Sequence, residues 1–148
     1  MTASGDRFLS EITSQPDALR RAADALAEQR GALDRIAEEA TEAGTIVFTG
    51  MGSSYDACYP AVNDLAGRGV AALLVDTAEL LHFRRPILRR RAFLTIVSQS
   101  GESAEIVKLA GDLANQRSRP VVVSVTNGLH NGLATRADIA IDTRAGIE

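Results

Sequence analysis

The spacing of apolar residues along the chain changes near residue 45. Before that point, apolar positions recur at steps of three and four residues, with a slip near Gly31, at Leu19, Ala22, Leu26, Leu33, Ile36 and Ala40. This spacing is typical of amphipathic helices. We expect a short helix near Phe8–Ile12, then one long helix or two that break near Gly31. Pro16 can open a helix, and Gly44 can close one.

After Gly44, short apolar runs rich in β-branched residues alternate with helical patterns. The expected strands cover residues 45–49, 70–75, 92–98, 120–125 and 138–142. The expected helices cover residues 53–67, 77–83 and 102–116, with a short turn near 131–135. The run Val121–Val125 is apolar on both faces, as in a buried parallel strand. The alternation predicts an α/β fold: a three-layer α/β/α sandwich, flavodoxin- or Rossmann-like, with a five-stranded parallel sheet and right-handed crossovers.

The pattern divides the chain into an N-terminal helical arm, residues 1–44, and an α/β domain, residues 45–148. In a doubly wound unit a helix normally covers the last strand. The sequence ends shortly after the fifth expected strand, so we expect a truncated unit, a split protein, or a partner that supplies the missing layer.

Two loops rich in serine and glycine carry the candidate chemistry. Gly50-Met51-Gly52-Ser53-Ser54-Tyr55 follows the first expected strand, and Ser98-Gln99-Ser100-Gly101-Glu102-Ser103 follows the third. Each loop precedes a helical pattern, and a helix start offers unpaired N–H groups to an anion. The serine hydroxyls are further donors, although Ser100 also stands where an ordinary helix N-cap is expected. Because carboxyl ends of parallel strands share one edge, the two loops predict a phosphate-binding site there.

Composition narrows the class of protein. The chain has 148 residues, 45% hydrophobic, with a formal net charge of −3. A net negative charge disfavours nucleic acid as the main partner. No apolar run is long enough to span a bilayer, and the N-terminus has no signal-peptide core, so we expect a cytoplasmic protein. Cys58 is the single cysteine, which fits a reducing compartment and a buried helical position.

A dinucleotide site is an alternative interpretation of the first loop. Gly50-Met51-Gly52 begins the fingerprint, and Asp76 ends the next strand at a suitable offset. However, Tyr55 replaces the third glycine of the motif. That alternative also leaves the second serine loop unexplained.

Other polar groups are weaker candidates. A basic cluster that could contact nucleic acid is more typical of a solvated connection or an oligomer contact, and it comprises Arg84, Arg85, Arg89, Arg90 and Arg91. His82 lies in an apolar helical context that favours a structural role. His130 lies on a loop at the expected ligand edge, and Glu148 lies at the same edge. We assign none of them as catalytic, and we expect no metal and no cofactor.

These motifs resemble the sugar isomerase (SIS) domain family, and they are most similar to the first of the two SIS domains in glutamine–fructose-6-phosphate aminotransferases. The resemblance runs from about Phe8 to Glu148. The motifs that carry it are Glu11-Ile12 with Gln15-Pro16, Gly50–Tyr55, Glu79-Leu80 with Phe83-Arg84, Arg90-Arg91, Ser98–Ser103 and Ala145-Gly146-Ile147-Glu148.

The resemblance implies a site for a sugar phosphate. In that family the serine-rich loop holds the phosphate, which makes Ser98, Gln99, Ser100 and Ser103 candidates for binding it. Gly52, Ser53 and Ser54 are candidates from the first loop, toward the phosphate or the sugar hydroxyls. The glutaminase domain, the helix after the fifth strand, and the second SIS domain with its catalytic Glu, His and Lys do not appear in this sequence.

The resemblance implies binding of a hexose 6-phosphate, such as fructose 6-phosphate or glucosamine 6-phosphate, as part of an aldose–ketose isomerase, aminotransferase or deaminase. The alternative is a non-catalytic sugar-phosphate sensor. Uncovered apolar surface on the arm and the fifth strand predicts a homodimer or a partner SIS domain. We expect neither nucleic acid nor a membrane as a partner.

Overall fold

The computed structural model describes residues 3–89 and 91–146. Five strands form one parallel sheet in the order β2-β1-β3-β4-β5. Their bounds are β1 (Thr45–Gly50), β2 (Ala72–Asp76), β3 (Ala92–Val97), β4 (Val121–Thr126) and β5 (Ile139–Asp142). The predicted α/β sandwich with a five-stranded parallel sheet is therefore confirmed.

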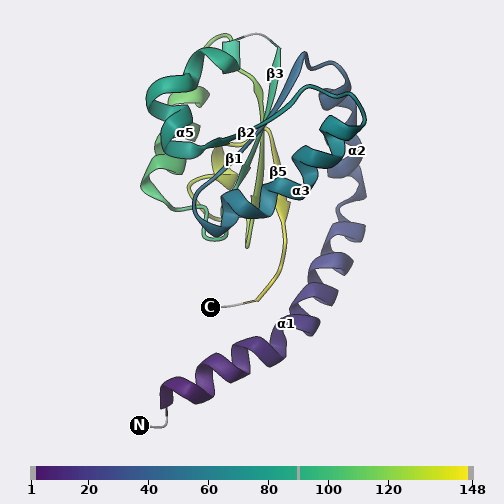
Figure 1. Ribbon diagram of the computed structural model, residues 1–148, viewed down its shortest axis with the longest axis vertical. Helices are drawn as coiled ribbons and strands as arrows, with labels where there is room; N and C mark the ends of the chain where they lie inside the picture. Colours follow the sequence, from purple (N-terminus) through teal and green to yellow (C-terminus); the bar gives the residue numbers. More distant parts are fainter. Residues whose placement is uncertain (1–2, 90, 147–148) are drawn as a thin grey trace.

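Helices cover both faces of the sheet. Two of them, α2 (Arg30–Thr41) and α3 (Ser53–Gly67), lie on one side, and α5 (Ala104–Ala114) lies on the other (Figure 1). Helix α3 has the predicted bounds, and α5 is shorter than the predicted 102–116. A 3₁₀ turn, η3 (Ala134–Arg136), occupies the position of the predicted short turn near 131–135.

Each face of the sheet has its own apolar core. Toward α5, Val47, Leu94 and Val122 of the sheet pack with Leu109 and Leu113. Toward α2 and α3, the buried residues are Ile46, Phe93, Val123, Ile139 and Ile141, with Ile36, Ala40 and Leu65 packed against them. Full burial of one such side chain stabilises the fold by about 1.5–3 kcal/mol. These two cores fix the strands whose carboxyl ends carry the site.

The segment after β2 differs from the single helix predicted over 77–83. It begins as α4 (Thr77–Glu79), continues as a π-helical turn, η1 (Leu80–Arg84), and ends as a 3₁₀ turn, η2 (Arg85–Arg89). Leu80 and Leu81 are buried by this path, whereas His82 and Phe83 are exposed. A π-helical turn is wider than a turn of α-helix. Here it places Leu80 and Leu81 in the core and leaves Phe83 in solvent.

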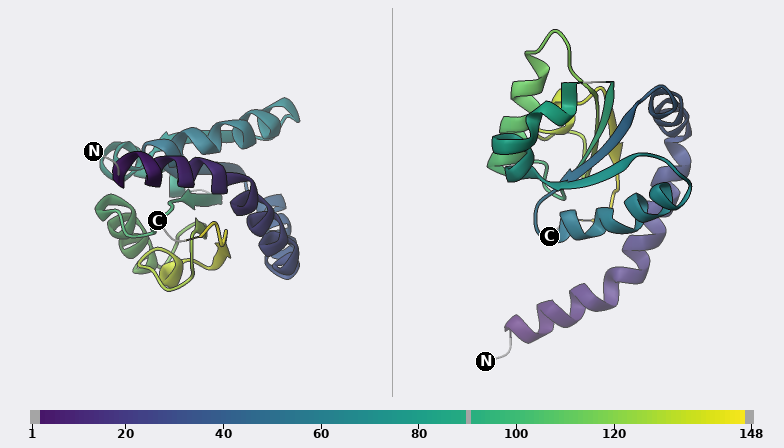
Figure 2. Two further views of the ribbon diagram at one scale, coloured as in Figure 1. Left: turned by 90° about the horizontal axis from the view of Figure 1, so that it is seen from below. Right: turned by 45° about the horizontal axis from the view of Figure 1, so that its top comes forward.

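The N-terminal region forms two helices. Helix α1 (Ala3–Glu28) ends at Gln29, close to the predicted break near Gly31, and α2 follows. The separate short helix near Phe8–Ile12 is absent, because α1 runs through that region continuously. Figure 2 shows α1 projecting beyond the body of the domain, whereas α2 packs against the sheet.

Pro16 does not open a helix, as the sequence suggested, but lies inside α1. A proline there removes one backbone donor. The hydroxyl of Thr13 donates to Leu9 O at 3.0 Å, and that of Ser14 donates to Glu11 O at 2.9 Å. These side-chain bonds go to carbonyls of the turn before the proline, and back-bonding of this kind is typical of helices that bend.

Candidate functional site

A cavity of about 260 Å³ opens at the carboxyl edge of the sheet. It lies where β3, β4 and β5 end and where α3 begins. Its lining consists of Ser53, Ser54, Ala57, Val97, Ser98, Gln99, Val125, Thr126, Asn127, Thr143 and Ala145. Segments from four parts of the chain thus meet at the edge where open α/β sheets bind ligands.

The strand order explains why the cavity forms here. From β1 the chain crosses to β2 on one side of the sheet and then returns to β3 on the other side of β1. The loops that follow β1 and β3 therefore diverge at adjacent strands and leave a crevice between them. Both loops lead into helices, α3 and α5, whose first N–H groups point toward this edge.

The loop between β3 and α5 is organised by its own serines. The hydroxyl of Ser98, which is 4% exposed, accepts a hydrogen bond from Gly101 N at 3.1 Å. The hydroxyl of Ser100 accepts one from Glu102 N at 3.2 Å. Gly101 has a φ of +66°, a conformation that favours glycine. The loop is therefore preformed as a tight turn, with Ser98 serving as its internal brace.

Ser100 does not cap the following helix, contrary to the expectation from sequence. Helix α5 begins at Ala104, so its N-cap is Ser103, three residues later than predicted. The Ser103 hydroxyl makes no capping hydrogen bond. A serine at this position usually bonds the N–H groups of the first turn, so its hydroxyl and those N–H groups stay available to a ligand.

Contacts with the loop after β4 hold the serine loop in place. Glu102 accepts a hydrogen bond from Gly132 N at 2.6 Å through Oε1. Leu133 N donates to Gly101 O at 3.0 Å. Asn131 is buried, and its amide bonds Gly128 O and Ala134 N, each at 2.8 Å. Glu102 is thus a bracing residue of this loop.

The loop between β1 and α3 makes a close approach to its helix. A Cβ on Gly50 would lie 2.8 Å from the backbone of Ser54, so only glycine fits there. Gly52, the N-cap of α3, has a φ of +54°. This path sets Ser53 and Ser54 at the start of α3, facing the cavity.

The structure brings four of the seven predicted binding residues to the cavity: Ser53, Ser54, Ser98 and Gln99. Gly52, Ser100 and Ser103 lie on the same two loops but are not part of its lining. Sequence reasoning did not nominate Thr126, Asn127, Thr143 or Ala145. Their shared signal was position, because they follow the fourth and fifth predicted strands at the same edge, and Ala145 also begins one of the motifs that carry the family resemblance.

The lining of the cavity contains hydroxyl, amide and apolar groups and no side chain that titrates near neutral pH. His82 and His130 are exposed, and neither belongs to the lining. Cys58 is a buried residue of α3, and burial raises the pKa of its thiol to about 11. Glu148 lies outside the described residues. The cavity can therefore bind a polar ligand, but its lining supplies no obvious proton acceptor.

Asp76 is engaged in a way that does not favour the dinucleotide alternative. Its carboxylate caps α4, accepting from Ala78 N at 2.8 Å and from Glu79 N at 3.4 Å. A dinucleotide site needs such a carboxylate for a ribose hydroxyl. Asp76 is also absent from the cavity lining.

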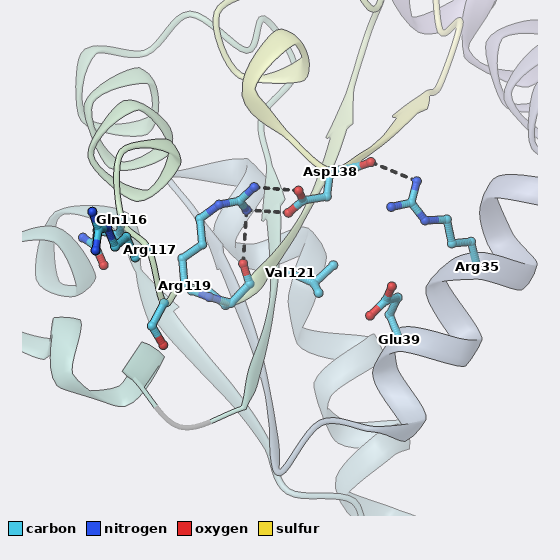
Figure 3. Close-up of a pocket in the computed structure, with 9 residues that line it drawn as sticks. Arg35, Glu39, Gln116, Arg117, Arg119, Val121 and Asp138 are labelled. Atoms are coloured by element: carbon cyan, nitrogen blue, oxygen red, sulfur yellow. Dashed lines mark hydrogen bonds and ion pairs between the residues drawn. The ribbon is translucent and has the colours of Figure 1, made fainter.

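A second cavity, of about 510 Å³, lies at the opposite, amino edge of the sheet. Figure 3 shows Arg119 paired with Asp138 beside it and Arg35 reaching toward Asp138 from α2. Arg119 donates to both carboxylate oxygens of Asp138, at 2.5 and 2.7 Å, and Arg35 donates to Asp138 O at 3.2 Å. The Arg119 guanidinium lowers the pKa of Asp138. Because Arg119 and Asp138 are paired with each other, they connect the starts of β4 and β5 and do not form a free binding site.

Three arginines of the basic cluster pair with carboxylates. Arg84 meets Glu79 at 3.2 Å, Arg85 meets Asp112 at 2.8 Å, and Arg91 meets Glu42 at 3.1 Å. Arg90 lies outside the described residues. The pairing supports a solvated structural connection more than a nucleic-acid surface.

Two kinds of feature are absent from the residues that the structure describes. No helix in that part of the chain is long and apolar enough to cross a membrane. Within the same residues, no three or more His, Cys, Asp or Glu side chains come together as metal ligands.

Comparisons with known proteins agree on a family. The model of the SIS domain matches residues 40–148. A glutamine–fructose-6-phosphate aminotransferase of Pyrococcus horikoshii is 34% identical over 143 residues, which are 95% of this chain and 23% of the relative. The chain thus spans about a quarter of the length of the aminotransferases it matches.

Solved structures show the same relationship. The C-terminal domain of glucosamine-fructose-6-phosphate aminotransferase from Francisella tularensis superposes with a TM-score of 0.76 at 25% identity, covering 95% of this chain and 40% of that chain. The Vibrio vulnificus NanR protein, complexed with ManNAc-6P, superposes with a TM-score of 0.69 at 25% identity, covering 86% of this chain and 49% of that chain.

Proposed function

This chain belongs to the SIS domain family, and from that premise we propose that the cavity at the carboxyl edge binds a hexose 6-phosphate or a related amino-sugar phosphate. The related proteins point to this ligand class: one is named for fructose 6-phosphate, and another is complexed with ManNAc-6P. The phosphate binds at the loop Ser98–Ser103, and the sugar extends toward Asn127 and Thr143.

One observation carries the proposal: two hydroxyl-rich loops meet at the strand-order switch between β1 and β3. The start of α5 offers backbone N–H groups beside the Ser103 hydroxyl, which makes no capping bond. Hydrogen bonds to a charged group contribute about 1.5–3 kcal/mol each, so several donors on one phosphate give measurable affinity. The amide and hydroxyl groups of Gln99, Asn127 and Thr143 match the hydroxyls of a sugar.

Within a larger protein, we assign this domain to the binding of substrate by an aldose–ketose isomerase, aminotransferase or deaminase. Isomerisation moves a proton between adjacent carbons and needs a positioned base. The described lining has no such group, so the base is supplied from outside this cavity. The same observation favours the second candidate, a sensor that binds the sugar phosphate without transforming it.

We further propose that the chain pairs with a second copy or with another SIS domain. Helix α1 leaves Phe8 67%, Leu9 59% and Leu19 72% exposed, and a monomer rarely leaves such a row of apolar side chains uncovered.

We place the protein in the cytoplasm, since its single cysteine is a buried thiol and forms no disulfide within the chain.

Calorimetry with matched ligands tests the proposed function. Fructose 6-phosphate and glucosamine 6-phosphate should bind at least tenfold more tightly than fructose and glucosamine, because only the phosphate engages the serine loop. Arabinose 5-phosphate, which has one carbon fewer, serves as the probe for sugar length. Equal affinity for fructose and fructose 6-phosphate would exclude the proposed ligand class.

A further inference from the structure

The side chain of Gln29 occupies the open side of the edge strand β5. Gln29 lies in the break between α1 and α2 and is half-buried. Its Nε2 donates to Asp142 O at 2.8 Å, and its Oε1 accepts from Asp142 N at 2.9 Å. Both backbone groups of Asp142 are paired by one amide, much as a neighbouring strand would pair them.

Gln29 is itself fixed, so the pairing holds the strand in a defined place. Its Nε2 also donates to Ala25 O in the last turn of α1 at 2.8 Å. Ala25 is buried in that helix, at 1% exposure. The amide therefore connects a buried point of the helical arm to the carboxyl end of β5.

Asp142 begins the segment 142–146, which forms one wall of the cavity. Two residues of this segment, Thr143 and Ala145, line the cavity. The carboxylate of Asp142 accepts from Gly128 N at 2.8 Å and from Arg144 N at 3.0 Å. A change in the position of Asp142 is therefore transmitted to the wall and to the loop after β4.

The segment 142–146 has further support besides Gln29. The side-chain amide of Asn127 accepts from Ala145 N at 2.9 Å and donates to Gly146 O at 2.5 Å. Arg144 pairs with Glu28 at 2.5 Å, but both side chains are more than half exposed, and exposed ion pairs contribute little. Arg21 donates to Ala145 O at 3.2 Å, also at the surface. On the inner side, Thr143 N donates to Thr126 O at 2.9 Å.

From these contacts we infer that Gln29 is a positioning residue of the sugar-binding side of the cavity, acting through Asp142 and the segment 142–146. The inference rests on the proposed function. The serine loop on β3 is braced mainly by Ser98 and by the loop at Gly132, with one further bond from Asn127 N to Gln99 O at 2.9 Å. Loss of the Gln29 amide therefore disturbs the sugar side of the cavity and leaves the phosphate loop intact.

The test compares two ligands on three variants of the 148-residue chain. Gln29→Ala removes the amide, and Gln29→Glu keeps the size and one acceptor oxygen but loses the donor to Asp142 O. Gln116→Ala is the control, because Gln116 is exposed beyond the end of α5 and away from the cavity. Calorimetry gives the dissociation constant for fructose 6-phosphate. Titration followed by NMR gives that for inorganic phosphate.

We expect both Gln29 variants to bind fructose 6-phosphate about fivefold to tenfold more weakly, as the loss of one or two neutral hydrogen bonds implies. Binding of inorganic phosphate should stay within about twofold of wild type, and Gln116→Ala should change neither value. Hydrogen exchange at residues 143–146 should accelerate in the Gln29 variants and not in the control.

Two results would overturn the inference. One is unchanged affinity for fructose 6-phosphate in both Gln29 variants. The other is an equal loss for sugar phosphate and inorganic phosphate, which would mark Gln29 as a purely structural residue. A wild-type chain that binds no sugar phosphate would instead refute the proposed function, and this inference with it.

Discussion

Gly101 packs directly against the side-chain amide of Asn131, and a Cβ on Gly101 would overlap that amide. Asn131 cannot move away easily, because its amide bonds Gly128 O and Ala134 N. Gly101 also has a φ of +66°. The serine loop and the loop after β4 thus pack tightly against each other at Gly101.

Gly101→Ala should therefore damage both stability and binding. The left-handed conformation costs a non-glycine residue about 1–2 kcal/mol, and the overlap adds to it, so the free energy of unfolding should fall by ~2–3 kcal/mol. Gly31→Ala is the matched control, because no atom lies within 4 Å of the added Cβ in α2. It should be neutral or stabilising by less than ~1 kcal/mol. Denaturant unfolding measures both, and similar losses would refute the steric argument.

The double variant Ser100→Ala with Ser103→Ala tests the hydroxyls of the serine loop. Neither residue braces the loop as Ser98 does: Ser100 makes one exposed bond, and Ser103 makes no capping bond. Stability should fall by less than ~2 kcal/mol, whereas affinity for fructose 6-phosphate should fall at least tenfold. Ser118→Ala, an exposed serine at the amino edge, should alter neither. Full affinity in the double variant would show that the Ser100 and Ser103 hydroxyls do not bind the phosphate.

Much of the fold could be predicted because the core residues repeat with a clear period. The predicted strands differ from the observed ones by at most two residues at either end, and helix 53–67 is reproduced in full. The arm was harder, because a single helix continues through Pro16, and Ala25 is buried while Leu19 is 72% exposed. Apolar spacing identifies a helix, but it does not say which face another element covers.

The site could be predicted only in part for a related reason. Serine- and glycine-rich loops are visible in sequence, so Ser53, Ser54, Ser98 and Gln99 could be nominated. Asn127 and Thr143 belong to no motif, Ala145 belongs to one that had no assigned role, and the register of parallel strands brings all three to the cavity. The misplacement of the N-cap at Ser100 has a local cause, because the Gly101 turn delays the start of α5 to Ala104.

The ion pair between Arg119 and Asp138 predicts a specific dependence of stability on pH. The pKa of Asp138 is lowered, mainly by its hydrogen bond with Arg119. The pair therefore stabilises the fold above about pH 4, the ordinary range of an unfolded aspartate, and this contribution is lost as the pH falls through the lower folded value.

Asp138→Asn should accordingly lower the free energy of unfolding by ~1 kcal/mol at pH 7, because the pair is about a quarter exposed. The difference from wild type should shrink as the pH falls below 4, and the affinity for fructose 6-phosphate should not change. Asp34→Asn, at an exposed position in α2, is the control and should have little effect at either pH. A difference that persists unchanged at low pH would contradict the electrostatic origin.

Self-association is expected through the exposed row on α1. Light scattering at micromolar concentration should give twice the mass of the chain, and the double variant Phe8→Ser with Leu19→Ser should give the mass of one chain. These side chains are 67% and 72% exposed, so the substitutions should leave the circular dichroism of the domain unchanged. A monomeric wild-type chain would show that α1 does not mediate self-association under these conditions.

The most direct measurement of the central claim is an amide NMR titration of the chain with fructose 6-phosphate. If the phosphate binds at the serine loop and the start of α5, the amides of Gln99–Ala104 should shift most and saturate together, followed by those of Ser53 and Ser54. The amides of residues 117–121 other than Pro120, around the amino-edge cavity in Figure 3, should not respond. A saturable response at residues 117–121 without one at Gln99–Ala104, or no response at all, would contradict the account.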